Sequence, residues 1–282
     1  MDIHVSLEYD KYRPTNVFLA AAFCGTVFAL ESANIVGYTE LALNAGGKNM
    51  VGPCFVNTGS TTIKLSDIEV TGYENSDYYM WTDMAAPVVV VQRRASNGQP
   101  YAQYSWSAEF DGENWLDGSW VKDIGDDNDP VLKPGDALWV QTPDLEDCTA
   151  FNFKVSGEVM KGSIGFELNA GGKISVCNPS PVACKLSDVE VQGYQNSDYY
   201  MWTDMAAPVV VIQKLLSNGQ PERQYSWSAE FDGENWLDGS WVKDIGDVSA
   251  ADWSLAPGEG MWVQCPDLED CEKFTMVFPA AL

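Results

Sequence analysis

The sequence predicts an all-β protein made of two tandem homologous antiparallel β-sandwich or barrel-like domains that are held by disulfides. The strongest observation is an internal repeat, because residues 104–126 recur unchanged at 225–247 and residues 75–90 recur at 196–211. Each copy has the commonest size of a domain with its own core, roughly 100–150 residues. Short apolar segments between turn residues, and paired cysteine spacings, support the same fold class. The predicted boundaries are 1–29 for a leader, 30–157 for the first copy and 158–282 for the second.

The first segment, residues 1–29, stands outside the repeat and resembles a secretory leader. Lys11 and Arg13 precede an apolar stretch at 17–29 that ends in small residues, as a signal peptide does before its cleavage site. The stretch is shorter than the ~20 residues that span a bilayer. A cleaved signal peptide is the preferred interpretation, and a retained anchor or a buried helix are the alternatives. The sequence thus predicts a secreted, extracellular or cell-surface protein, with no transmembrane span in the mature chain.

The pattern along each copy is typical of short strands. Over Gln103–Phe110, apolar and polar residues alternate, with Tyr104, Trp106 and Ala108 on one face. The Asn-Gly pair at 97–98 predicts a hairpin turn before this strand, since both residues accept positive φ. No stretch of the mature chain keeps a helical period over three turns. Further strands are expected at Val88–Arg93, Lys64–Val70, Tyr78–Thr82, Ala137–Gln141 and Phe151–Val155.

Six cysteines remain once Cys24 is removed with the leader. Two pairs have the same spacing in the two copies, and a third pair is present in the second copy and jointly missing from the first. Because disulfides persist in oxidising compartments, this pattern predicts three bridges. Free buried thiols are the alternative. The predicted bridges are Cys54–Cys148, Cys177–Cys271 and Cys184–Cys265.

Charge and composition limit the partners and the chemistry. The chain has 16 Lys and Arg against 41 Asp and Glu, a formal net charge of −25, which repels nucleic acid and anionic membranes. The single histidine, His4, lies in the leader, so the mature chain would lack an imidazole for general-base catalysis, zinc ligation or a Ser-His-Asp triad. Phosphate-cradling and dinucleotide motifs are absent as well. The sequence therefore predicts a non-enzymatic protein that requires no cofactor.

Acidic residues crowd one Gly-containing segment of each copy. Calcium prefers several carboxylate and carbonyl oxygens, so a Ca²⁺ site is one interpretation, although the spacing is not that of an EF-hand loop. A solvated extracellular surface is the other interpretation. The candidate ligands are Asp111, Glu113, Asp117, Asp123 and Asp126 in the first copy and Asp232, Glu234, Asp238, Asp244 and Asp247 in the second.

Tryptophans in the same segments suggest a ligand platform. Trp115 and Trp120, with their counterparts Trp236 and Trp241, lie between Gly and Asp residues, where an exposed ring would be costly. One interpretation is that these rings plug the end of the sandwich. The other is that they form an aromatic platform for a sugar ring, which predicts glycans as ligands.

Two short motifs carry a resemblance to a known group of proteins. Residues 32–38 (SANIVGY) and 255–263 (LAPGEGMWV) resemble the ANIVGY and APGEGxWV signatures of secreted bacterial β-rich repeat proteins that have no established activity. The first copy departs from the second signature and reads KPGDALWV at 133–140. The resemblance implies an extracellular β-rich building block, and it supplies no catalytic residues.

Two functions are expected from these observations. The first is a non-enzymatic secreted or cell-surface structural protein that associates with itself head to tail into filaments. Its basis is that residues 34–43 match residues 159–168, which directly follow the last strand of the first copy. If the C-terminal strand of one molecule met the N-terminal strand of the next in the same way, strand addition would join them. The alternative is a tandem carbohydrate-binding or adhesion module that uses the four tryptophans.

Overall fold

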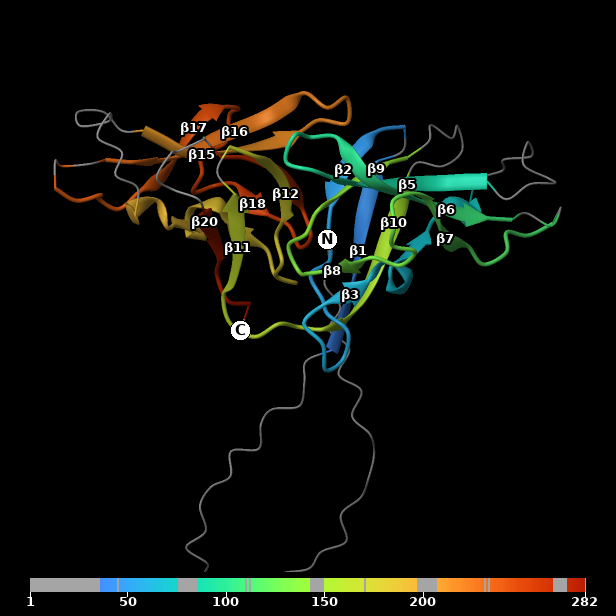
Figure 1. Cartoon of the computed structure of the whole chain (residues 1–282). Coiled ribbons are helices and arrows are strands. Elements are labelled where there is room, and N and C mark those ends of the chain that lie inside the picture. The colour runs from blue at the N-terminus through green and yellow to red at the C-terminus, as the bar shows by residue number, and fades with distance from the viewer. Residues whose placement is uncertain are drawn as a thin grey trace, which may run out of the picture.

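The computed structural model describes residues 36–44, 46–75, 86–109, 111, 113–142, 150–169, 171–196, 207–230, 232, 234–265 and 273–281. In these residues the protein is all-β and sandwich-like, and its strands form two groups of antiparallel sheets. Figure 1 shows the two groups side by side: the first half (residues 36–158) runs from blue to yellow-green, and the second half (residues 164–281) from yellow to red. The predicted all-β antiparallel class is confirmed.

Three sheets build the first half. Their strand orders are β1-β10-β4, β2-β9-β5-β6-β7 and β3-β8. The strands are β1 (Val36–Asn44), β2 (Lys48–Val51), β3 (Ile63–Lys64), β4 (Glu69–Thr71), β5 (Ala86–Arg94), β6 (Pro100–Ala108), β7 (Ser119–Ile124), β8 (Val131–Leu132), β9 (Leu138–Gln141) and β10 (Ala150–Glu158).

The second half repeats this topology. Its sheets have the orders β11-β20-β14, β12-β19-β15-β16-β17 and β13-β18, which match those of the first half strand for strand. The strands are β11 (Ile164–Asn169), β12 (Lys173–Cys177), β13 (Cys184–Lys185), β14 (Glu190–Gln192), β15 (Ala207–Leu215), β16 (Pro221–Ala229), β17 (Ser240–Ile245), β18 (Ser254–Leu255), β19 (Gly260–Gln264) and β20 (Lys273–Phe278).

Strand β6 shows why the alternating pattern was informative. Tyr104, Trp106 and Ala108 are buried, as the period-two pattern predicts, and β6 pairs with β5 across the turn that contains Gly98. Gly98 has a φ of 80°, a left-handed value that glycine adopts without steric cost. The same strand pairs on its other edge with β7, which places Trp120 opposite Trp106. Strand β7 was not predicted, because its residues had been assigned to an acidic loop.

One predicted strand is wrong in part. Lys64–Val70 is divided by the 3₁₀ turn η1 (Leu65–Asp67), which leaves β3 and β4 as separate short strands. The Asp67 carboxylate accepts a hydrogen bond from the Lys64 backbone N–H at 3.3 Å, and Ile68 N–H donates to the Leu65 carbonyl at 3.0 Å. A short polar side chain that bonds the backbone competes with a strand ladder in this way. The strand expected at Tyr78–Thr82 lies outside the described residues.

Helical structure in the described part of the chain consists of short 3₁₀ turns. Besides η1, these are η2 (Tyr73–Asn75), η4 (Leu186–Asp188) and η5 (Tyr194–Asn196). Accordingly, the described residues form no helix with the length and apolar character needed to cross a membrane.

Each half has its own hydrophobic core. The first is built around Tyr104, Phe151 and Phe153, and the second around Tyr225, Phe274 and Trp253. Apolar burial of this kind is the main term that stabilises a folded domain.

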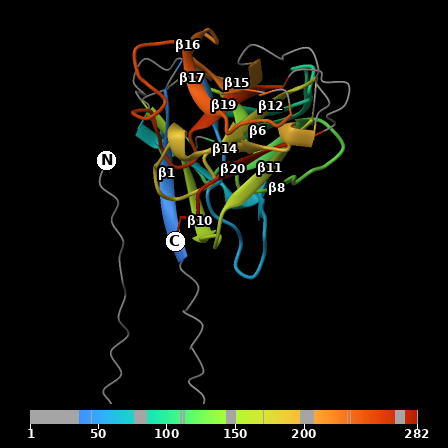
Figure 2. The same cartoon turned by 90° about the vertical axis from the view of Figure 1, so that its left-hand side faces the viewer.

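The connection between the halves is a short segment, residues 159–163. β10 ends at Glu158 and β11 begins at Ile164, and the two strands belong to different sheets. In addition, β20 is bordered by β11 on one side and β14 on the other, so the C-terminal strand has no edge free for the N-terminal strand of another molecule. In Figures 1 and 2, β1 and β10 lie side by side, as their antiparallel pairing requires.

The halves instead meet along a seam of reciprocal backbone contacts. Lys48 N–H donates to the Ser217 carbonyl at 3.0 Å, and Lys173 N–H donates to the Ser96 carbonyl at 2.9 Å. Lys48 and Lys173 occupy the same place in the repeated LNAGGK motif, and Ser96 and Ser217 the same place in the repeated SNGQP motif. Each half therefore caps the edge strand of the other with its own hairpin turn.

A second reciprocal pair lies further along the seam. Gly52 N–H donates to the Gly258 carbonyl at 3.0 Å, and Cys177 N–H donates to the Gly135 carbonyl at 2.9 Å. Contacts that exchange equivalent positions define an isologous, two-fold interface, and such an interface closes on itself. Within one chain, the two reciprocal surfaces of this contact therefore occupy each other.

The cysteines differ from the prediction. Cys184 has a free thiol, so the predicted Cys184–Cys265 bridge is not formed. Cys184 pairs with Leu255 on β18, whereas Cys265 follows the far end of β19, whose five residues lie between. The Cys265 backbone N–H donates to the carbonyl of Gly172, before β12, whereas the carbonyl of Leu255 accepts from Asn178, after β12. The two cysteines therefore lie toward opposite ends of β12, and a disulfide needs Cα atoms within ~7 Å. Cys54 and Cys177 also have free thiols, and their predicted partners, Cys148 and Cys271, lie outside the described residues.

Candidate functional site: a cleft between the halves

The acidic residues do not come together as a metal site. Among the described residues, which include all ten predicted ligands, no group of three or more Asp, Glu, His or Cys side chains could hold a metal ion. Asp123 on β7 accepts hydrogen bonds from Ser105 Oγ at 2.5 Å and from Gln103 Nε2 at 3.1 Å, and Asp244 makes the same contacts in the second half. These carboxylates tie β7 and β17 to the neighbouring strand, so the calcium interpretation is not supported.

Asp111 and its counterpart Asp232 have a local role as well. The Asp111 carboxylate accepts the backbone N–H groups of Asn114 at 2.7 Å and Glu113 at 2.8 Å, and Asp232 repeats both contacts. Donors that favour the charged carboxylate lower the pKa of both aspartates below their ordinary value. Each aspartate thus closes an Asx turn at the surface.

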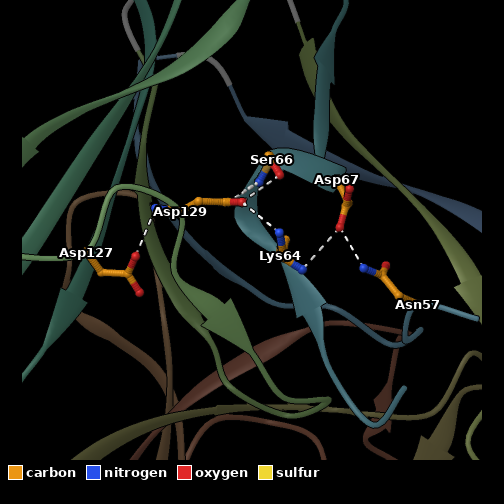
Figure 3. Close-up of polar contacts among 6 residues, drawn as sticks. All are labelled: Asn57, Lys64, Ser66, Asp67, Asp127 and Asp129. Carbon is orange, nitrogen blue, oxygen red and sulfur yellow. Dashed lines mark hydrogen bonds and ion pairs between the residues drawn. The ribbon is translucent and has the colours of Figure 1, made fainter. Parts of the chain in front are cut away.

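Two further acidic residues, Asp127 and Asp129, belong to a polar network that joins the segment before β8 to η1 (Figure 3). Asp129 accepts from the backbone N–H and the hydroxyl of Ser66, each at 2.9 Å, and its ion pair with Lys64 measures 3.8 Å. Asp127 accepts from the Asp129 backbone N–H at 3.0 Å. The second half has Trp253 in the corresponding segment, stacked on Tyr225 with ring centroids 5.1 Å apart.

The predicted tryptophan platform has the geometry of the plug interpretation. Trp120 donates its indole N–H to the Ile68 carbonyl at 2.7 Å and packs edge-on against Trp106, with centroids 5.3 Å apart. Trp241 makes the same contacts in the second half and is buried. Trp115 and Trp236 are half-buried against tyrosine rings of η2 and η5. The rings therefore close one end of each core.

The site that the sequence did not predict is a cleft of about 480 Å³ along one side of the seam. One wall consists of β1, β2 and Trp139 of β9. The other consists of the end of β15, the adjoining hairpin and the turn at 256–260. A volume in this range accommodates a small ligand, and a position between two folded units is typical of ligand sites.

Charged side chains line the wall from the second half. Lys214 Nζ lies 2.8 Å from Glu259 Oε1 and 3.7 Å from Glu222 Oε2, and the Lys214 and Glu259 side chains are 30% and 18% exposed. Glu259 Oε2 also accepts the Ala256 backbone N–H at 2.9 Å, which fixes the carboxylate within its own turn. These groups therefore present one ammonium and two carboxylates to the cleft from restrained positions.

Amide and aromatic groups line the wall from the first half. Asn49 Oδ1 accepts the Asn44 backbone N–H at 3.1 Å, and Asn49 Nδ2 donates to the Asn44 carbonyl at 3.3 Å. Lys48 Nζ lies 5.8 Å from the centre of the Trp139 ring. On the same ring, the guanidinium of Arg94 lies 4.1 Å from the centre, and burial lowers the Arg94 pKa. Cation–π contacts hold Trp139 as a rigid wall.

The opposite side of the seam, called the filled side below, carries larger aromatic side chains at the equivalent positions. There Phe166 occupies the position of Leu41, and a Cβ placed on Gly135 would overlap the Phe166 ring. In place of Lys214 and Glu222, this side has Arg93 with its guanidinium 5.5 Å from the centre of the Tyr101 ring. A signal for the cleft was present in the sequence, because these positions differ between copies that are otherwise nearly identical.

The comparisons give no relative for this chain: no family model, no curated protein and no solved structure matches it.

Proposed function

We propose that the protein is a non-enzymatic, secreted or cell-surface binding protein of two tandem β domains, and that it holds a carbohydrate in the cleft between them. The observation that carries the proposal is the cleft itself, which is lined by apolar, amide and charged side chains from both halves. The leader-like residues 1–29 support secretion.

The chemistry of the cleft favours a sugar over other small ligands. Sugar hydroxyls both donate and accept hydrogen bonds, so they suit a wall that offers the Asn49 amide, the Glu222 carboxylate and the Lys214 ammonium together. The C–H faces of a sugar suit the apolar part of the cleft, which includes Leu41 and Met50. An entirely apolar ligand would remove water from the charged groups and offer them no hydrogen bond in return, which is unfavourable.

The test is a glycan microarray probed with the mature protein, followed by titration calorimetry of the glycans that are retained. Ala42 is exposed at the mouth of the cleft, and Ala42→Trp should fill it and weaken binding at least tenfold. The matched control is Glu167→Trp, because Glu167 holds the same place on the filled side of the seam. Glu167→Trp should bind like the parent.

Two results would contradict the proposal. The first is a parent protein that retains no glycan above background. The second is an equal loss of binding in both variants, which would place the glycan away from the cleft.

A second candidate function, association between molecules, has an observation of its own. β1 is an edge strand of its sheet, and its first residues expose large apolar side chains, with Val36 65% and Tyr38 58% exposed. An exposed apolar edge is a template for strand addition. Replacing both residues by lysine should convert a dimeric parent to a monomer in light scattering, and a parent that is monomeric at millimolar concentration would exclude this candidate.

A further inference from the structure

Two cysteines from opposite halves meet at the seam. Cys54 and Cys177 are both 0% exposed. The Cys177 sulfur lies 4.0 Å from the carbonyl oxygen of Pro53, the residue bonded to Cys54, and 3.8 Å from the carbonyl oxygen of Asp136. A Cβ placed on Gly52 would lie 2.6 Å from the same sulfur. The Cys177 side chain therefore crosses the seam and rests on the segment that carries Cys54.

The hydrogen bonds of the seam match residues of the two halves differently from the sequence spacing. The sequence spacing had matched Cys177 to Cys54, but the reciprocal hydrogen bonds match Cys177 to Gly52, since both N–H groups donate to the glycine of the opposite PG turn. Gly52, with no side chain, leaves the space that the Cys177 sulfur fills. Cys54 and Cys177 are therefore not equivalent residues of the two copies, and the repeat no longer predicts one equivalent bridge within each copy.

We propose that Cys54 and Cys177 form a disulfide that cross-links the two halves when the chain folds in an oxidising compartment. The inference rests on the proposed secretion and is independent of glycan binding. A disulfide requires the two sulfurs about 2.05 Å apart, and the observation that favours it is the contact of the Cys177 sulfur with the carbonyl oxygen of Pro53, the residue bonded to Cys54.

The reaction is a two-step thiol–disulfide exchange with a low-molecular-weight or protein disulfide as oxidant. The thiolate of one cysteine attacks the oxidant, forms a mixed disulfide and displaces one thiolate. The thiolate of the other cysteine then attacks the protein sulfur of the mixed disulfide and displaces the second. The protein thiols lose two protons and two electrons in total, and the oxidant becomes two thiols.

Burial decides when this exchange takes place. Desolvation raises the pKa of Cys54 to about 12 and raises the pKa of Cys177 well above its ordinary value. Only the thiolate is reactive, so both groups are unreactive at neutral pH once the seam has closed. The exchange therefore takes place while the halves come together, before the closed seam excludes the oxidant, and a reduced folded protein oxidises slowly.

The test is oxidative refolding of the full chain in a glutathione redox buffer, followed by non-reducing proteolysis and mass spectrometry. The expected result is a peptide that joins Cys54 to Cys177, together with a melting temperature about 5–10 °C above that of the reduced protein. Cys54→Ser and Cys177→Ser should each remove the linked peptide and the shift. Cys184→Ser is the matched control and should keep both.

The result that would overturn the proposal is a map in which Cys54 is joined to Cys148 and Cys177 to Cys271, or one in which both remain thiols after oxidative refolding. The map is read on the unaltered chain, so it decides the question even if a serine variant folds poorly. Because it involves no glycan, its outcome is separate from that of the binding test.

Discussion

The two sides of the seam have equivalent backbone contacts and different side chains. On one side, Leu41 and the Lys214–Glu259 ion pair border an open cleft. On the other, Phe166 packs onto Gly135, and Arg93 lies over Tyr101. The hydrogen bonds that dock the halves are the same on both sides, within 0.1 Å for each reciprocal pair. The backbone therefore docks the halves, whereas side chains that vary between the copies determine the lining of each side of the seam.

A repeat can therefore present different side chains on the two sides of one seam. A two-fold interface between identical copies would carry either two clefts or none. On the filled side, Phe166 stands in the place of Leu41, and the Arg93–Tyr101 contact stands in the place of the Lys214–Glu222 ion pair. The backbone hydrogen bonds of the two sides remain the same. The predictions below alter the sides separately, in order of expected effect.

The largest loss of stability is expected at Gly135, where the filled side of the seam is most crowded. Gly135 has a φ of 96°, and a Cβ there would overlap the Phe166 ring. Gly135→Ala should therefore destabilise the protein by about 2–4 kcal/mol, from backbone strain and overpacking together. Gly59→Ala is the control, since Gly59 also has a positive φ, of 71°, but no atom within 4 Å of the added Cβ. Urea denaturation should show a loss of only about 1 kcal/mol for the control.

The next effect concerns the symmetry of the seam. Phe166→Leu gives the filled side the residue of the cleft side and should cost about 1–2 kcal/mol for the lost ring packing against Phe278, whose centroid is 5.8 Å away. Calorimetry with a retained glycan should then show weak binding at a second site. A stoichiometry that stays at one would mean that Phe166 alone does not close the opposite side.

A smaller effect is expected at the ion pair of the cleft side. Lys214→Met should destabilise the protein by about 0.5–1 kcal/mol, because the ion pair is partly solvated. Its cost should shrink in high salt as the charges are screened. Arg93→Met on the filled side removes a cation–π contact worth about 0.5–1 kcal/mol, and its cost should depend less on salt. Urea denaturation at two ionic strengths measures the free-energy cost of both substitutions. An equal salt dependence of the two costs would contradict the expected difference between the ion pair and the cation–π contact.

The smallest expected effect is on the pH dependence of stability, and it should be equal in both halves. Asp111 and Asp232 have folded pKa values below the ordinary 3.8. Their contribution to stability is therefore complete above the unfolded pKa and is lost as pH falls through the lower folded pKa. NMR titration of the carboxyl carbons should give the same depressed value for both residues. Asp111→Asn should abolish the contribution of the first half to the loss of stability at low pH and leave the contribution of Asp232 unchanged.

Much of the fold could be predicted from the sequence. The alternation of Tyr104, Trp106 and Ala108 fixed which face of β6 is buried, since a strand side chain can point only to one face or the other. The repeat implied that the second half would have the same topology. The interruption of Lys64–Val70 was missed because it depends on Asp67 bonding the Lys64 backbone, a local contact that competes with the strand pattern.

The cleft and the thiol pair were decided only by tertiary structure. Repeated motifs determined that Lys48 and Lys173, or Ser96 and Ser217, would have matching environments, but not that they would bond each other across a seam. Docking depends on the shapes and hydrogen-bonding groups that two folded surfaces present together, and no sequence spacing records these. That is why Cys177 was matched to Cys54 by position, whereas the seam matches it to Gly52 and places its sulfur beside the segment that carries Cys54.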